Sequence, residues 1–276
     1  MCVLSRAYID DSQDGKLKHF VNMTAVLGTA RSWTKLDREW RKWLHVKPRI
    51  DYYKSREWRN LDGQFEQFRL LPMGEGRIAA NAKRETLIKI LGGHKKSGIG
   101  FFTSIVPLSA YARFRTLHEE AARIFPEDPY RRTFDGVMLP ICRLVLRDDP
   151  EGFISFIYDK DIMREEKLRE EYGSFKEKNP NCASVMRSLA QLDDELWPGL
   201  QIADLAANVA TQEIRENLTG WDGITPTQRR GQILNGMFAC MEVWTEPFMA
   251  EVLKANTGID LASQARTGPE QFAPLP

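Results

Sequence analysis

The chain lacks most of the features that assign a protein to a special structural class. Its four cysteines lie far apart (Cys2, Cys142, Cys182 and Cys240), so the close spacings of a zinc site or a disulfide framework are absent. No apolar run approaches the length of about eighteen residues that a membrane span needs, and no signal-peptide pattern follows Met1. We therefore expect a cytoplasmic protein with no membrane partner.

A strong net charge is also missing. The 39 Lys and Arg residues nearly balance the 38 Asp and Glu residues, which leaves a formal charge of +1 and a pI near 7.7. No overall electrostatic field thus indicates a nucleic-acid or membrane partner. Hydrophobic residues make up 42% of the 276 residues, enough to bury the core of one large domain or two small ones.

Two glycine-rich segments each lack a residue that their motif requires. Gly93–Gly98 has the glycine spacing of a phosphate-binding loop, but Ile99 occupies the position of the essential lysine. Gly98 and Gly100 lack the third glycine of a dinucleotide-binding fingerprint. Neither segment therefore predicts a nucleotide site of these two kinds.

The pattern of apolar residues indicates an α/β fold. A first pair of strands is expected at Val3–Ile9 and Phe20–Leu27, joined by a turn at Asp14-Gly15. Helical spacing of apolar residues predicts a helix over Ser32–Leu44. Later strands are expected at Gly100–Val106, Phe153–Tyr158 and Ser184–Leu192. A hairpin followed by strands that alternate with helices predicts a mixed sheet with helices on both sides.

We expect three regions along the chain. Residues 1–220 form the α/β domain, with a helical insertion at about 46–97 after the second strand. A helix beginning at Pro198 closes this domain, since proline favours the first helical turn. Residues 221–262 form a helical extension, with two helices between Thr227 and Asn256, and residues 263–276 form a loose tail.

Three aspartates lie where a carboxylate is costly to remove from water. Asp10 ends the first strand, Asp159 ends a nearly apolar strand, and Asp204 lies early in the helix from Pro198. Ligands gather beyond the carboxyl ends of strands in open α/β sheets, so Asp10 and Asp159 meet there if their strands are neighbours. Converging carboxylates with no nearby lysine would bind Mg²⁺ or Mn²⁺. As turn formers and a helix-start charge, the same acids also have a purely structural explanation.

Other polar residues are candidates for supporting such a site. On the helix from Pro198, an amide-rich polar face contains Gln201, Asp204, Asn208 and Thr211 at helical spacing, so Gln201 and Asn208 are expected beside the carboxylate. His45 follows a tryptophan-rich helix, where an imidazole either transfers protons or simply stabilises the helix C-terminus. Asp161 and the Asp193–Asp194 pair are able to add to a metal shell, although solvated loop acids are the simpler interpretation.

Positive charge is concentrated in one segment of the chain. Residues 31 to 59 contain ten Lys and Arg but four acids, a local charge of +6. Arg31, Lys35, Arg38 and Lys42 share one side of the Ser32–Leu44 helix, opposite its tryptophans. Such a basic stripe suits contact with a nucleic-acid backbone. A solvated helix face explains the pattern equally well.

Motifs at both ends of the α/β region resemble an uncharacterised family named domain of unknown function 3800. Tyr8–Ser12 is similar to its Tyr-Ile-Asp-Glu-Ser-Gly signature, and Gln201–Ala206 is similar to its Gln-x-Ala-Asp-Leu-x-Ala element. Between them, Leu44-His45 resembles a Phe/Leu-His stretch, and Phe153–Asp159 resembles an internal strand that ends in Asp. The resemblance spans about residues 1–218 in the expected order.

The resemblance implies a ribonuclease H-like fold, whose members cluster carboxylates around two metal ions on a mixed sheet. Carried over by position, it makes Asp10, Asp159 and Asp204 the metal-binding and catalytic acids and favours His45 for proton transfer. Two positions depart from the signature, since Asp11 replaces its Glu and Gln13 its Gly. Asp11 is one methylene shorter and therefore reaches a metal ion through water or not at all.

Together these observations predict a metal-dependent nuclease, in which carboxylate-bound Mg²⁺ or Mn²⁺ promotes phosphodiester hydrolysis. The basic stripe would hold the nucleic-acid backbone. Two alternatives stay open. One is a non-catalytic module of the same fold that binds nucleic acid or protein. The other is a phosphatase or nucleotide hydrolase that uses the same acids on small substrates.

Overall fold

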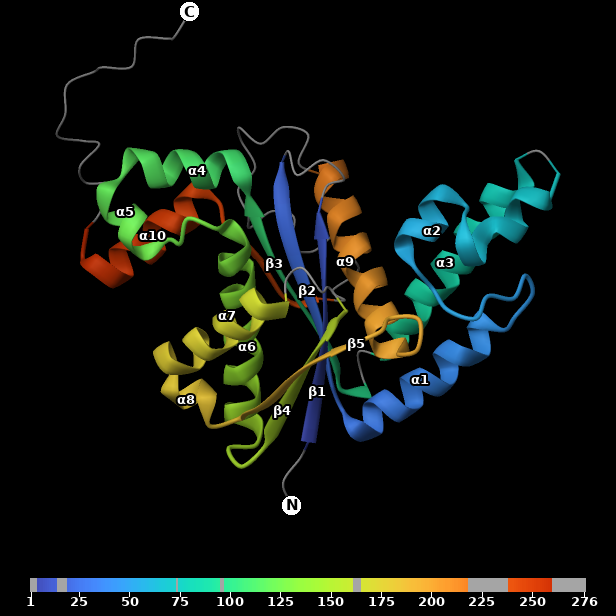
Figure 1. The fold of residues 1–276 in the computed structure, drawn as a ribbon, viewed down its shortest axis with the longest axis horizontal. Coiled ribbons are helices and arrows are strands. Elements are labelled where there is room, and N and C mark those ends of the chain that lie inside the picture. The colour runs from blue at the N-terminus through green and yellow to red at the C-terminus, as the bar shows by residue number, and fades with distance from the viewer. Residues whose placement is uncertain are drawn as a thin grey trace, which may run out of the picture.

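The computed structural model describes residues 4–13, 19–72, 74–94, 97–160, 165–217 and 238–259. These residues form a six-stranded mixed sheet with helices against both of its faces (Figure 1). The strand order is β5-β4-β1-β2-β3-β6. The strands are β1 (Leu4–Gln13), β2 (Phe20–Thr29), β3 (Ile99–Pro107), β4 (Phe153–Asp159), β5 (Met186–Leu192) and β6 (Phe238–Val243). The predicted α/β class is confirmed.

The helices fall into groups between the strands. Between β2 and β3 lie α1 (Ala30–Leu44), α2 (Ser55–Asn60), the 3₁₀ helix η1 (Gly63–Leu70) and α3 (Glu75–His94), so the insertion is helical as predicted. Before β4 come α4 (Leu108–Leu117), α5 (Glu119–Ile124) and α6 (Pro129–Asp148). The remaining helices are α7 (Glu165–Lys178), α8 (Pro180–Ala183), α9 (Pro198–Asn217) and α10 (Glu246–Thr257). None of the helices in these described ranges has the length and hydropathy of a membrane span.

Strand pairing brings the first and fourth strands side by side. β1 pairs antiparallel with β2 and parallel with β4, and Ile9 lies opposite Tyr158 in that register. β4 is nearly all apolar because it lies inside the sheet, with β1 on one side and β5 on the other. The carboxyl ends of β1 and β4 therefore meet at the same edge, as the placement of Asp10 and Asp159 requires.

Two predictions about the strands need correction. β1 continues to Gln13, so Asp10 lies inside the strand and not at its end. Phe238–Val243 forms β6, parallel to β3, where we expected helix. A short apolar run does not distinguish a buried strand from a helix segment, because either periodicity accommodates it. The predicted Asp14-Gly15 turn and the tail lie outside the described residues.

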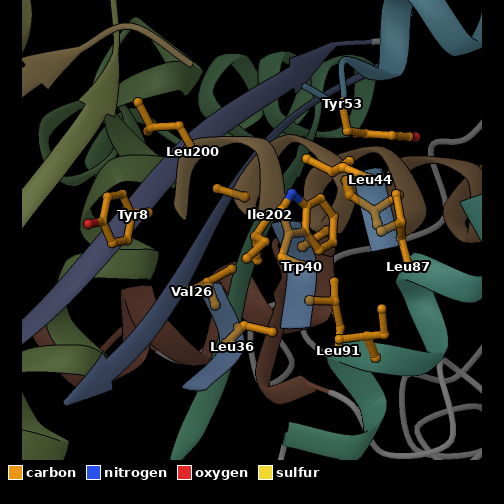
Figure 2. Packing of buried hydrophobic residues seen from close by; sticks show 14 of the residues in the cluster. Tyr8, Val26, Leu36, Trp40, Leu44, Tyr53, Leu87, Leu91, Leu200 and Ile202 are labelled. Carbon is orange, nitrogen blue, oxygen red and sulfur yellow. The ribbon is translucent and has the colours of Figure 1, made fainter. Parts of the chain in front are cut away.

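One face of the sheet is covered by α9, with α1 and α3 beyond it (Figures 1 and 2). Tyr8, Val26 and Leu200 share a buried cluster with Trp40 of α1. Gly199 permits this close approach, because a Cβ atom there would lie 2.6 Å from ring carbons of Tyr8. The first turn of α9 is thus held directly against β1. Helix α6 covers the opposite face, where Phe134 and Ile141 pack with Phe156.

Candidate acidic site

Three structural elements bring the predicted aspartates together. Tyr8 and Ile157 pack into the cluster under α9, and Asp10 and Asp159 follow them by two residues on the same face of the sheet. Asp204 lies in the second turn of α9, the helix that covers this face. All three side chains are half-buried. The neighbouring strands and the close packing of α9 therefore create one acidic site.

Asp10 is at the centre of the negative charge. Burial raises the pKa of its carboxyl well above the usual value, and the Asp204 carboxylate adds to this rise. The charges of Asp11, Asp159 and Asp194 act in the same direction. Burial and neighbouring negative charges both disfavour the ionised form of a carboxyl group. The electrostatics thus show that the acids predicted from distant parts of the sequence act on one another.

The other two predicted acids are affected in the same way. Burial and then the nearby Asp194 charge raise the pKa of Asp159 to about 6, although the N–H groups of Lys160 and Asp194 oppose the rise. Burial raises the pKa of Asp204 to about 6 as well, although the backbone N–H of Ser55 donates to its Oδ2 at 2.6 Å. In both carboxyl groups the effect of burial thus outweighs the groups that stabilise the ionised form.

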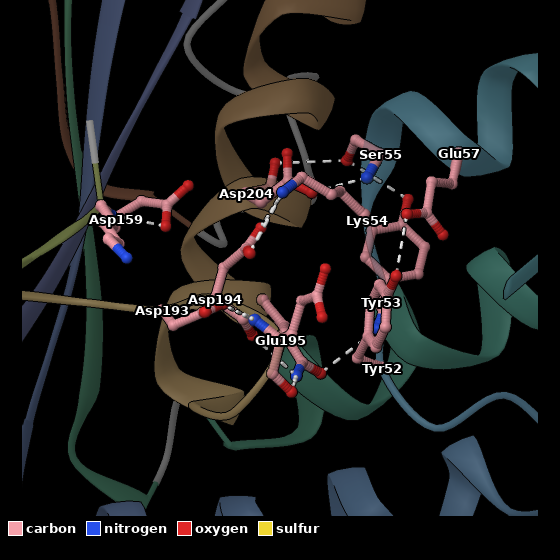
Figure 3. Close-up of polar contacts among 12 residues, drawn as sticks. Tyr52, Tyr53, Lys54, Ser55, Glu57, Asp159, Asp193, Asp194, Glu195 and Asp204 are labelled. Carbon is pink, nitrogen blue, oxygen red and sulfur yellow. Dashed lines mark hydrogen bonds and ion pairs between the residues drawn. The ribbon is translucent and has the colours of Figure 1, made fainter. Parts of the chain in front are cut away.

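A lysine lies inside this acidic site. Lys54 Nζ is 2.9 Å from Asp194 Oδ2, and Figure 3 shows the lysine reaching toward Asp194 and Asp204. Burial lowers the pKa of Lys54, but its hydrogen bond and ion pair with Asp194, with Asp159 and Asp204 nearby, raise it overall. The condition that no lysine lies near the converging carboxylates is therefore not met. Lys54 belongs to the insertion, which no sequence pattern places beside the sheet.

Asp194 is the acid whose position was misjudged from sequence. Its residue is 5% exposed, whereas the adjacent Asp193 is exposed as a solvated loop acid should be. The Asp193–Asp194 doublet is visible in the sequence. Which of the two side chains is buried depends on how the loop packs, and the sequence does not show this. Asp161 lies outside the described residues.

Gln201 ties the segments that carry these charges to α9. Its residue is 2% exposed, and its Oε1 accepts from Trp40 Nε1 at 3.0 Å and from the Tyr53 N–H at 3.3 Å. Its Nε2 donates to the Asp194 carbonyl at 2.9 Å. Gln201 thus fixes the backbone on both sides of the Lys54–Asp194 ion pair. A role of Gln201 in supporting a metal site stays a prediction.

The rest of the polar face of α9 is divided between other neighbours. Asn208 Oδ1 accepts from Arg84 Nη2 of α3 at 3.0 Å. Thr211 Oγ1 accepts from Asn22 Nδ2 of β2 at 3.1 Å. Asn208 therefore lies one turn from Asp204 but is engaged with the insertion, and its predicted support of the site remains a prediction.

His45 and Asp11 do not join the site directly. His45 ends α1, its side chain is exposed, and no hydrogen bond or ion pair within the described ranges involves its imidazole. Asp11 follows Asp10 in β1 and lies opposite Met23, a residue of the core under α6. Its side chain therefore points to the other face of the sheet. Asp11 therefore affects Asp10 through its charge from the opposite face of the sheet, and roles of Asp11 and His45 in the reaction stay predictions.

The basic stripe is exposed but faces away from the acids. Arg31, Lys35, Arg38 and Lys42 are all exposed on α1. At about 100° per residue they lie opposite Trp40, the residue that contacts Gln201. A partner bound along this stripe therefore lies on the far side of α1 from α9, and nucleic-acid binding stays a prediction.

The ligand atoms of the acidic site suit a hard divalent cation, but the side chains are not already arranged around one ion. Within the residues that the structure describes, no three His, Cys, Asp or Glu side chains are positioned to bind one metal ion. Lys54 and the Ser55 N–H already engage the oxygens of Asp194 and Asp204. The donors are nonetheless carboxylate oxygens with a shortage of positive charge, the set that Mg²⁺ or Mn²⁺ prefers.

No family model matches this chain, and no curated protein matches it either. The resemblance to domain of unknown function 3800 therefore stays a prediction based on the two motifs and their order.

Proposed function

We propose that this protein is a divalent-metal-dependent nuclease with a ribonuclease H-like fold. The observation that carries the proposal is the convergence of Asp10, Asp159 and Asp204 from β1, β4 and α9 at one edge of a mixed sheet. The charges of Asp204 and Asp159 raise the pKa of Asp10, and a bound cation would offset this effect. The sheet with helices on both faces agrees with the fold that the resemblance implies.

Asp10, Asp159 and Asp204 would hold Mg²⁺ or Mn²⁺, which supplies an acidified water and neutralises charge on a phosphodiester. The backbone orients two of these carboxylates in advance. The Ser55 N–H donates to Asp204, and the Lys160 N–H donates to Asp159 Oδ1 at 2.7 Å. Directed carboxylates lose less conformational freedom when they bind a cation, so these N–H groups favour binding.

Nucleic acid is the substrate class that the α1 stripe favours. Four exposed cations on one helix face suit a phosphate backbone, which they position without reading its sequence. Because the stripe and the acids lie on opposite sides of a helix about 10 Å across, a mononucleotide does not touch both. We therefore expect a polymer that passes around α1 to be hydrolysed better than a short substrate.

The test is the triple variant Asp10→Asn/Asp159→Asn/Asp204→Asn, which preserves side-chain size. It should abolish Mg²⁺-dependent cleavage of RNA, DNA and hybrid substrates while the protein remains folded by circular dichroism. Asp193→Asn is the matched control, since this carboxylate is exposed beside the site and should be dispensable. Unchanged cleavage by the folded triple variant would refute the proposed role of these three aspartates.

A non-catalytic module of the same fold is the second candidate. The observation that favours it is the Lys54–Asp194 ion pair, which supplies positive charge to the acids without a metal ion. This reading predicts no Mg²⁺ or Mn²⁺ binding by calorimetry and no turnover on RNA, DNA or hybrid substrates. Measured binding of either ion to the wild type would contradict it.

A further inference from the structure

Lys54 places an ammonium group among the carboxylates that would bind a divalent cation. We propose that Lys54 is a resident counter-ion that competes with the divalent cation for the acidic site and thereby sets the affinity for metal. This role rests on the metal-dependent reaction proposed above. It adds a residue from the insertion to a site otherwise built from two strands and a helix.

The Lys54–Asp194 pair is close and poorly hydrated on one side. Nζ lies 3.1 Å from Oδ1 and 2.9 Å from Oδ2, so the ammonium engages both carboxylate oxygens. The Asp194 side chain is 7% exposed, which leaves little room for water to replace the lysine. The Lys54 ammonium thus stabilises the buried position of Asp194, because an unpaired buried carboxylate is costly.

The backbone on either side of Lys54 is fixed to α9. The Tyr53 N–H donates to Gln201, and the Ser55 N–H donates to Asp204 Oδ2. Both flanking side chains are buried. Lys54 therefore points into the acidic site because its neighbours are held there. A loose surface lysine would have no such constraint.

One ammonium does not balance the charge around it. Lys54 acts on the carboxylates of Asp159, Asp194 and Asp204, while Asp10 has these three acids and Asp11 around it. A divalent cation carries more charge in less space and satisfies this shortage better. An ammonium and a metal ion cannot engage the same oxygens, so Asp194 can join Asp10, Asp159 and Asp204 around a metal ion only when Lys54 leaves it.

The lysine is able to leave without unfolding its segment. Its side chain is 32% exposed, and a flexible four-carbon stem carries the ammonium. Rotation of the stem returns the charge to water while Tyr53 and Ser55 stay in place. Asp194 is then free to join the carboxylates that hold the metal ion. The ion pair is therefore a replaceable element of the metal-free state.

The experiment compares Mn²⁺ binding by isothermal titration calorimetry at about pH 8, above the pKa values of about 6 of Asp159 and Asp204. Lys54→Met retains the stem and removes the charge, so Mn²⁺ should bind about tenfold tighter or more, as expected for a lost repulsion at close range. Lys89→Met is the matched control, because Lys89 is exposed on α3 and its removal changes the net charge equally. It should leave the affinity within about twofold of wild type.

A second variant keeps the test decisive if Lys54→Met fails to fold. Lys54→Arg should bind Mn²⁺ more weakly than wild type, since a guanidinium fork pairs more firmly with both oxygens of Asp194. Unchanged or weaker binding by folded Lys54→Met would overturn the counter-ion role while the metal site stands. Absence of Mn²⁺ binding in the wild type and in Lys54→Met alike would overturn the metal-dependent reaction itself, and this role with it.

Discussion

Metal-free protein should be more stable in mild acid than at slightly alkaline pH, because two acids of the site hold protons more tightly when folded. The pKa values of Asp159 and Asp204 are about 6 in the fold, against 3.8 for an exposed aspartate. Between these values the folded chain binds more protons than the unfolded chain. The free energy of unfolding therefore falls as the pH rises from about 4 to about 6, and the full loss is present above that range.

The size of the effect follows from these values. Between about pH 4.5 and pH 8, one such group would change the free energy of unfolding by about 2 kcal/mol. Both side chains are half-buried, so solvent screening reduces the effect, and we expect about 2 kcal/mol for the pair. At roughly 2 cal/mol/K of unfolding entropy per residue, the 276-residue chain would melt about 3 °C higher in acid from this source.

Differential scanning calorimetry in chelator measures this directly. Other groups also titrate, so the reference is Asp159→Asn/Asp204→Asn, and the quantity of interest is the wild-type melting temperature minus that of the variant. This difference should fall between about pH 4.5 and pH 8, and Mn²⁺ at the higher pH should recover it for the wild type alone. Melting curves of the two proteins that run parallel across the range would refute the electrostatic reasoning.

Two further predictions concern the packing that positions the site. Gly199→Ala should lower the free energy of unfolding in urea by about 1–3 kcal/mol and weaken Mn²⁺ binding, because the added Cβ meets the Tyr8 ring and moves α9 away from β1. Gly173→Ala is the control and should not lower stability, because its Cβ meets no atom within 4 Å. Equal stability of the two variants would contradict this explanation. Lys83→Met should lower stability by about 2 kcal/mol, because the Lys83 ammonium donates to three backbone carbonyl oxygens at and after the end of α1. Lys89→Met on the same helix is the control, and equal denaturation midpoints for the two lysine variants would show that the carbonyl contacts contribute little.

Much of the fold follows from local sequence patterns. The apolar run of β4 reads as an inner strand because both of its faces are covered, and the spacing of Trp33, Leu36 and Trp40 reads as a helix with one buried face. The periodicity of apolar residues is visible in the sequence because it reflects which face of each helix or strand is buried. Strand β6 was missed because six residues are too few for either periodicity to prevail.

The site was predictable only in part. Asp10 and Asp204 stand in short motifs, and Asp159 follows a recognisable strand, so three acids were named from sequence. The sequence favours a solvated loop acid for Asp194 and does not point to Lys54, because their burial depends on contacts such as that between the Tyr53 N–H and Gln201, 148 residues apart. His45 shows the converse. The resemblance favours it for proton transfer, but its side chain is exposed at the end of α1.

By itself, the sequence determined an α/β chain with carboxylates on two strands and one helix, because hydrophobic periodicity and the identity of acidic residues are local properties. Tertiary structure alone decided that β1 and β4 are neighbours, that Asp10 and Asp11 point to opposite faces of the sheet, and that the insertion brings Lys54 among the acids. The physical reason is that the interaction between two charges depends on their distance in space and not on their separation along the sequence. The balance of charge in the site thus depends on how distant segments pack.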